Sequence, residues 1–293
     1  MKTPEADSIR GADPVAPRVE VADDASGVPQ QGRRALNLGM HRFSGLYVLA
    51  LIIIVFGIWV PDTFLTTQTL KTVASQQAVV AILALALLVP LAAGIFDLSV
   101  GTMLGLAVVL VCKFQAMGIP FGLAIVLTLL IGATVGAVNA FVVVFWRVDS
   151  FIATLGSSSI LGALIYWVSG NQTIVTGISP DFVRLGQGDL WGVPLPVVYL
   201  VVLAALLLYL TEYRPLGRKI YATGGNELAA RLSGVRTDAL VVLSLVLSGC
   251  IAAFAGVVFA AIIGSGSLTA GPPFLLPAFA ALFLAPPRST TGG

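Results

Sequence analysis

The chain has few charged residues. Lys, Arg, Asp and Glu make up 10% of its 293 residues, whereas 57% of the residues are apolar. An ordinary soluble domain is about 25% charged. So few charges cannot cover a solvated surface, which excludes a soluble protein. A net charge of +2, without a basic stripe interleaved with aromatic residues, also argues against a nucleic-acid partner.

Residues that bind metals or form disulfides are equally scarce. His41 is the only histidine, and both cysteines, Cys112 and Cys250, lie inside apolar stretches. A metal centre needs several such ligands together, and buried cysteines behave as small apolar side chains. The sequence also lacks a nucleophile with a neighbouring base. We therefore predict no metal site, no disulfide and no catalytic residues.

Long apolar runs dominate what is present. Because about 20 mostly apolar residues cross a bilayer, the runs predict an all-α fold, a polytopic bundle of about eight transmembrane helices or part-helices. The predicted helices cover residues 43–60, 73–93, 98–116, 122–146, 151–169, 195–210 and 239–263, with an eighth beginning near Phe274. The second and third could also form one long, interrupted element.

The flanking segments differ in composition from the runs. Residues 1–42 are rich in Pro, Asp, Ala and Gly without apolar periodicity, which predicts a disordered tail. The membrane domain is then expected over residues 43–285, with a cytoplasmic loop at 211–238, and residues 286–293 form a short C-terminal tail.

Positive residues predict the orientation, because Lys and Arg of short loops stay in the cytoplasm. A cytoplasmic N-terminus places most of these residues inside and only three of them in the outer loops. The inner set is Arg33, Arg34, Arg42, Arg147, Arg214, Arg218, Lys219, Arg231 and Arg236, and the outer set is Lys71, Lys113 and Arg184.

Polar residues inside the runs are candidates for a substrate pathway, since polar groups at membrane depth must be paired or face water. Asp97 could instead cap the following helix through its carboxylate, and Asn139 could form an interhelical hydrogen bond. The predicted pathway residues are Asp97, Ser99, Asn139, Thr154 and Ser157. The pairs Gly101/Gly105 and Gly132/Gly136 predict close helix packing.

The loop from Glu212 to Asp238 carries helix signals. Gly224-Gly225 predicts a turn, Asn226 a cap, Glu227 a favourable first-turn charge and Gly234 a helix end. We expect a short helix over about 226–233 at the membrane surface. On these residues alone it could be a simple interfacial anchor.

This loop resembles the cytoplasmic loop of the inner-membrane permeases of sugar-type ABC importers, such as the ribose, xylose and galactose permeases. Three further stretches are similar to that family in the same order, and the resemblance covers about residues 45–284. They are Gly94-Ile95-Phe96-Asp97-Leu98-Ser99-Val100-Gly101, in which Phe96 departs from the usual spacing, then Phe151-Ile152-Ala153-Thr154-Leu155-Gly156, and Ser248-Gly249 through Ala255-Gly256 to Pro277-Ala278-Phe279-Ala280-Ala281.

The resemblance implies a bacterial plasma-membrane permease that binds no cofactor itself. It would work with a second permease copy, receive a monosaccharide from an extracytoplasmic binding protein, and depend on a separate ATPase that uses ATP. The chain has no Gly-x-x-x-x-Gly-Lys-Ser/Thr loop to hold ATP phosphates. The implied ATPase-coupling residues are Gly217, Arg218, Gly225, Asn226, Glu227, Ala230, Arg231 and Gly234.

Two alternatives stay open at this point. The solute could be a branched-chain amino acid or a nucleoside, or the chain could be a secondary transporter, which needs coupling-ion sites among its helices. The run from Phe274 is also short for a crossing before Pro286-Pro287. Because the similar permeases continue through further helices, we expect a truncated member of the family or a shifted reading frame near Ala285, with poor activity alone.

Overall fold

The computed structural model describes residues 40–283, with side chains from Gly45 onward. Contacts divide the chain into two units, Met1–Val55 and Phe56–Gly293. Helix α1, Met40–Trp59, runs from the first unit into the second. The predicted C-terminal tail and nearly all of the predicted N-terminal tail lie outside the described residues.

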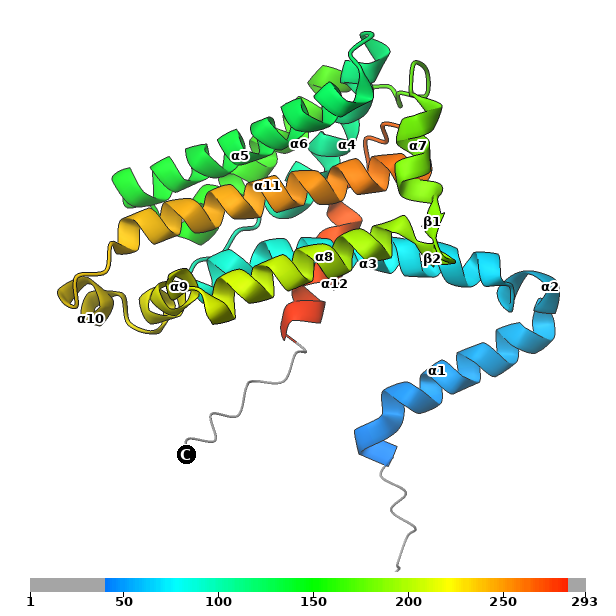
Figure 1. Cartoon of the computed structure of the whole chain (residues 1–293), viewed down its shortest axis with the longest axis horizontal. Coiled ribbons are helices and arrows are strands. Elements are labelled where there is room, and N and C mark those ends of the chain that lie inside the picture. The colour runs from blue at the N-terminus through cyan, green and yellow to red at the C-terminus, as the bar shows by residue number, and fades with distance from the viewer. Residues whose placement is uncertain (1–39, 284–293) are drawn as a thin grey trace, which may run out of the picture. The chain divides into compact units, whose positions relative to one another are not determined.

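The second unit is helical, and its helices follow the predicted apolar runs (Figure 1). The long helices are α3 (Thr67–Ala92), α4 (Val100–Ala116), α5 (Phe121–Phe145), α6 (Ser150–Ser169), α8 (Leu195–Leu208) and α11 (Thr237–Ile263). The shorter elements are α2 (Pro61–Phe64), α7 (Pro180–Gln187), the π-helix η1 (Tyr209–Tyr213), α9 (Pro215–Gly225), α10 (Glu227–Leu232), α12 (Pro272–Phe283) and a hairpin of β1 (Asp189–Leu190) and β2 (Val193–Pro194).

Five of the described helical segments are long and apolar enough to cross a membrane. They are Thr67–Ala92, Phe121–Phe145, Ser150–Ser169, Leu195–Tyr213 and Thr237–Ile263, and shorter apolar helical stretches cover Gly45–Trp59, Val100–Ala116 and Pro272–Phe283. This architecture confirms the prediction of a polytopic helical membrane protein.

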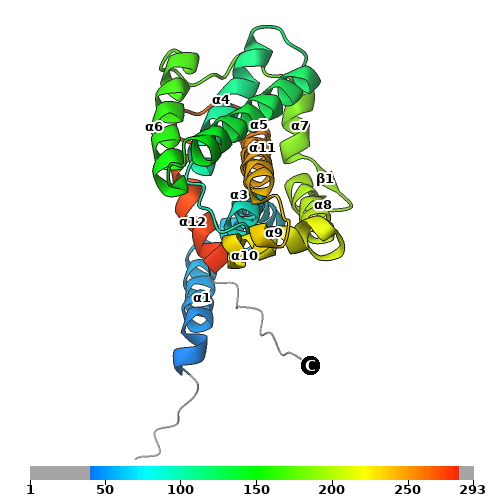
Figure 2. The same ribbon diagram turned by 90° about the vertical axis from the view of Figure 1, so that its left-hand side faces the viewer.

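Helix α11 is the centre of the second unit. It contacts α3, α4, α5 and α7, and Figure 2 shows it seen end-on between α5 and α3. A Cβ on Gly132 or Gly136 of α5 would clash with the α11 backbone, at Gly249 and Leu245 respectively. Glycine therefore allows two backbones to approach each other, as the predicted packing role requires.

The pair Gly101/Gly105 serves the same purpose on α4. A Cβ on Gly105 would lie 3.1 Å from the Gly271 backbone, and one on Gly101 would lie 3.0 Å from the Leu275 side chain. Gly101 and Gly105 therefore bring α4 against the start of α12. Helices α3 and α4 are separate elements with a non-helical break between them, which resolves the open question of one interrupted helix.

The predicted helices omitted α2, α7 and α9, and these three share one feature. Each has a proline in its first turn, at Pro61, Pro180 and Pro215. Proline fits that position because its missing amide would have no partner there. The segments are too short or too polar to cross a membrane, so a search for apolar runs of about 20 residues does not find them.

Candidate functional site

The break between α3 and α4 lies where the pathway residues were predicted. Pro90 lies in the last turn of α3, and Gly94 follows the helix with a φ of +80°. The Ile95 amide donates to the Pro90 carbonyl and the Gly94 amide to the Leu91 carbonyl, both at 3.0 Å. This hydrogen-bond pattern ends a helix with glycine in the left-handed region, so the chain leaves the helix axis at Gly94.

Asp97 is the centre of a buried polar cluster in this break. Its side chain is 1% exposed, and one carboxylate oxygen accepts hydrogen bonds from the Ser99 amide (3.0 Å) and hydroxyl (2.6 Å). The other oxygen accepts from the Ser248 hydroxyl of α11 at 2.7 Å. The Asn139 side-chain amide of α5 donates to the Ser99 hydroxyl at 3.0 Å. The carboxylate therefore links the start of α4 to α11 and, through Ser99, to α5.

The capping role predicted for Asp97 needs a correction. Ser99, not Asp97, is the N-cap residue of α4, and its side chain makes no capping hydrogen bond. The one backbone amide that donates to the Asp97 carboxylate is that of Ser99, two residues further along. The prediction considered only local bonding, whereas the second carboxylate oxygen is used by Ser248, which is 151 residues away in the chain.

Two hydroxyl groups at the start of α6 hold the backbone of the break. The Ser150 hydroxyl accepts from the Phe96 amide at 3.2 Å, and the Thr154 hydroxyl accepts from the Leu98 amide at 3.1 Å. Buried backbone amides need such partners. Thr154 is thus brought together with Asp97, Ser99 and Asn139, whereas Ser157 is half-buried and makes no side-chain hydrogen bond with the described residues.

The loop after α8 folds into two short helices. The Asn226 side chain accepts from the Ala229 amide at 2.9 Å and so caps α10, and Gly234 follows the helix with a φ of +82°. The predicted helix is therefore present. Gly224-Gly225, however, is not a free turn: both residues belong to the last turn of α9, and the chain turns at Asn226.

An ion-pair cluster joins α10 to the start of α11. Arg231 pairs with Glu227 at 2.8 Å and with Asp238 at 2.9 Å, and it donates to the Thr237 hydroxyl at 3.0 Å. Glu227 and Arg231 were predicted as coupling residues. Their side chains are partly exposed and also bind within the chain, so they fix the position of α10.

The other predicted coupling residues divide into buried and exposed ones. Gly217 and Ala230 are buried, and a Cβ on Gly217 would clash with the Thr211 backbone, so this glycine lets α9 fold back on η1. Arg218, Gly225, Asn226 and Gly234 are exposed. The sequence interpretation missed Leu228 and Leu232, which are 69% and 81% exposed. Their apolar i, i+4 spacing within a polar loop was the available signal.

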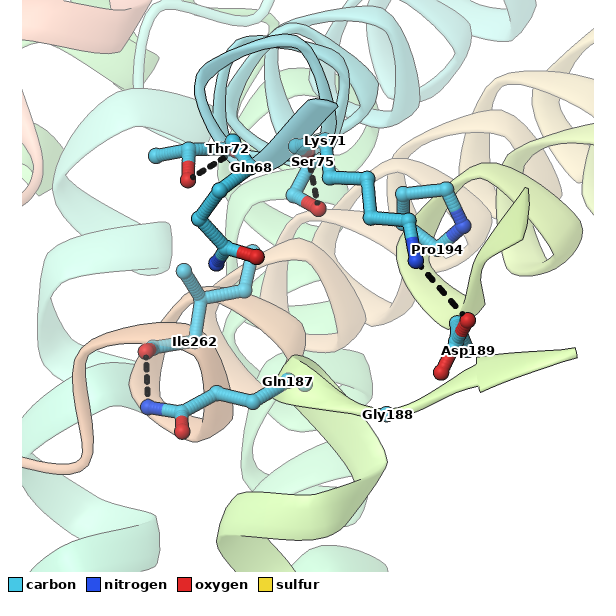
Figure 3. Close-up of a pocket in the computed structure, with 10 residues that line it drawn as sticks. Gln68, Lys71, Thr72, Ser75, Gln187, Gly188, Asp189, Pro194 and Ile262 are labelled. Atoms are coloured by element: carbon cyan, nitrogen blue, oxygen red, sulfur yellow. Dashed lines mark hydrogen bonds and ion pairs between the residues drawn. The ribbon is translucent and has the colours of Figure 1, made fainter. Parts of the chain in front are cut away.

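A polar pocket of about 400 Å³ lies at the opposite ends of α3 and α11 from α9 and α10 (Figures 1 and 3). The Lys71 ammonium pairs with the Asp189 carboxylate at 2.9 Å, which lowers the pKa of Asp189. The Gln187 amide donates to the Ile262 carbonyl at 2.9 Å, and Gln68, Thr72 and Ser75 complete the polar wall. Such amide, hydroxyl and charged groups can bind a polar solute.

The sequence interpretation did not single out this pocket. Gln68, Lys71, Thr72 and Ser75 recur at helical spacing on one side of α3, and that spacing was the available signal. Asp189 and Gln187 could not be placed beside them, because the contact joins segments more than a hundred residues apart.

Comparison with known proteins places the whole arrangement in a transporter family. The family described as "Branched-chain amino acid transport system / permease component" matches residues 69–290. The D-allose transport system permease protein AlsC of Escherichia coli K12 is 32% identical over 234 residues, 80% of this chain and 72% of the relative. The ribose import permease protein RbsC of the same strain is 34% identical over 249 residues, 84% of this chain and 77% of the relative.

A third similar protein is the autoinducer 2 import system permease protein LsrC of Escherichia coli O9:H4, 33% identical over 202 residues, 69% of this chain and 58% of the relative. No solved structure matches the chain. The family match covers the residues that form the break, the α9–α10 loop and most of the apolar helices. The chain therefore belongs to this permease family and is a multi-pass membrane permease.

Proposed function

We propose that the chain is the membrane-spanning subunit of an ATP-driven importer that carries a monosaccharide delivered by an extracytoplasmic binding protein. The observation that carries this proposal is the similarity to the D-allose and ribose permeases over 80% and 84% of the chain. A separate subunit would hydrolyse ATP, since this sequence has no phosphate-binding loop of the Gly-x-x-x-x-Gly-Lys type.

The surface of α10 is the proposed contact with the ATPase. Leu228 and Leu232 are exposed apolar side chains one helical turn apart, and a docking helix typically places such a pair in an apolar groove. Arg218, Gly225, Asn226, Glu227, Arg231 and Gly234 surround or support this contact. The buried residues Gly217 and Ala230 would act indirectly, by fixing the positions of α9 and α10.

The proposed substrate pathway runs beside the break between α3 and α4. In the conformation described here Asp97, Ser99, Asn139 and Thr154 hydrogen-bond one another or the break backbone. Opening of the break would free their polar groups for a sugar's hydroxyls, and Ser157 lies one turn beyond Thr154 on α6. A second permease copy would complete the route.

The orientation of the chain in the membrane, with a cytoplasmic N-terminus, is part of the same proposal. With Cys112 and Cys250 replaced by alanine, single cysteines at positions 10 and 225 are expected to react with an impermeant maleimide only from the cytoplasmic side. A cysteine at position 187 is expected to react only from outside. Labelling of position 225 from outside would reverse the proposed topology.

The functional test is association with a partner ATPase, sought among the proteins that co-purify with the chain. We expect the wild-type chain to retain the ATPase in a pull-down, and the double variant Leu228→Ser/Leu232→Ser to lose it while inserting normally. Ala229→Ser, on the same helix, is the matched control and should retain it. If the wild-type chain binds no ATPase, the importer proposal fails. If the double variant binds normally, α10 is not the contact.

Uptake assays show whether the transported solute is a sugar or a branched-chain amino acid. The family description names branched-chain amino acids, but the similar proteins named above carry the names of sugars or autoinducer 2. Excess D-ribose or D-allose should therefore inhibit transport, and excess leucine should not. Inhibition by leucine alone would favour the amino-acid alternative.

A further inference from the structure

The end of α9 and the break after α3 meet at two glycines. A Cβ on Gly224 would clash with the Ala92 carbonyl oxygen and would lie 2.9 Å from the Gly94 amide nitrogen. Conversely, a Cβ on Gly94 would lie 3.1 Å from the Gly224 Cα. The two backbones therefore touch directly, and any side chain at position 224 would separate them.

This contact is the point where the loop reaches the polar cluster of the break. Gly94 is three residues before Asp97, whose carboxylate binds Ser99 and Ser248. Gly224 is two residues before Asn226, which caps α10. Tightly packed elements move between discrete arrangements and are not continuously deformable. A displacement of α10 would therefore reach the break through α9.

We infer that Gly94 and Gly224 form the mechanical joint through which the α9–α10 loop controls the break and its Asp97 cluster. The alternative route is the chain itself, which continues from α10 through Gly234 into α11. That route reaches Asp97 only through Ser248 in the middle of α11, whereas the two glycines meet backbone to backbone three residues before Asp97. This inference rests on the proposed function and specifies how the loop acts.

One residue of the same helix provides a matched control variant. Gly224 and Ala222 both lie in α9, but Ala222 is exposed, so one further heavy atom there meets solvent and not the break. Gly224→Ala should therefore open the joint, while Ala222→Ser, which also adds a single heavy atom, leaves it intact. Gly94→Ala opens it from the other side and adds the strain of an alanine at a φ of +80°.

The readout is the reactivity of a cysteine in the break. Phe96 is 41% exposed, so Phe96→Cys, in a chain with Cys112 and Cys250 replaced by alanine, is accessible to a small maleimide. When Gly94 and Gly224 are both present, addition of the ATPase with ATP should change the labelling rate of this cysteine about fivefold. Gly224→Ala and Gly94→Ala should abolish the change and Ala222→Ser should keep it, with the ATPase still bound in each case.

The outcomes separate the inference from the proposed function. If Gly224→Ala binds the ATPase and still shows the full change in labelling, the joint does not transmit the movement. If the labelling of the parent chain does not respond to a bound ATPase, the loop does not control the break. Failure of the parent chain to bind the ATPase at all would overturn the proposed function, and the inference with it.

Discussion

Two polar contacts at opposite ends of α3 differ in burial. At the break, Asp97 is 1% exposed, and its carboxylate accepts hydrogen bonds from the Ser99 amide and hydroxyl and the Ser248 hydroxyl. At the other end, the hairpin is joined to α3 by the pair of Lys71 and Asp189, whose side chains are 37% and 48% exposed.

This difference has a consequence for stability. Buried hydrogen bonds cannot be exchanged for water, so breaking one leaves an unsatisfied group. An exposed ion pair can separate because water replaces each partner. Loss of the Asp97 hydrogen bonds should therefore lower stability much more than separation of Lys71 from Asp189.

The largest expected effect is at Asp97. Asp97→Ala removes the acceptor for the Ser99 amide and the Ser99 and Ser248 hydroxyls, and should lower the free energy of unfolding by about 3 kcal/mol. The measurement is thermal unfolding of the detergent-purified protein. Asp62→Ala, an exposed aspartate of α2, is the control and should change little. Equal melting temperatures for the two variants would contradict the structural role of the cluster.

Much of the fold follows from the sequence. Apolar runs of about 20 residues predicted the long helices, because burial of backbone groups in a bilayer allows little else. The glycine pairs predicted close packing, and Asn226 and Gly234 predicted the ends of α10. These features depend on residues near one another in the chain, so local reasoning could reach them.

The site could be predicted only in part. Asp97, Ser99, Asn139 and Thr154 were selected because polar groups are rare in the apolar runs, but the bond from Ser248 to Asp97 depends on the tertiary fold. The same holds for the contact of Gly94 with Gly224, since Gly224-Gly225 reads locally as a turn. Leu228 and Leu232 look like ordinary helix residues until their exposure is known.

A smaller effect is expected from the partners of Asp97. Ser248→Ala removes one donor and leaves the carboxylate its bonds with Ser99, so it should cost about 1 kcal/mol. The effect should not add to that of Asp97→Ala, since both remove the same hydrogen bond. A double-mutant cycle by thermal unfolding measures this coupling. Strict additivity would show that the two groups do not interact.

A substitution of Gly234 tests whether the end of α10 influences ATPase binding. Gly234→Val places a branched residue at a φ of +82°, which should cost about 1–2 kcal/mol locally, and it should reduce retention of the ATPase in a pull-down. Ala222→Ser is the control, because Ala222 is exposed and does not have a positive φ. Normal retention by Gly234→Val would mean that the end of α10 does not influence docking.

The smallest effect is expected at the outer pair. Lys71→Met should leave the melting temperature nearly unchanged at physiological salt, because exposed pairs are screened. Lys71 holds the pKa of Asp189 below 3.8, so any stabilisation is present above that value and is lost as the pH falls through the folded pKa. Melting curves between pH 3 and pH 7 measure it. A large loss of stability at pH 7 would remove the contrast between the two ends.

The most direct test of the proposed ATP-driven sugar import is uptake of labelled D-ribose into proteoliposomes. The vesicles would contain the permease and its ATPase, with ATP available to the ATPase and the binding protein on the opposite face. We predict uptake that requires ATP, the ATPase and the binding protein, and that falls about tenfold in Gly224→Ala but not in Ala222→Ser. Uptake driven by an ion gradient without the ATPase would contradict this prediction.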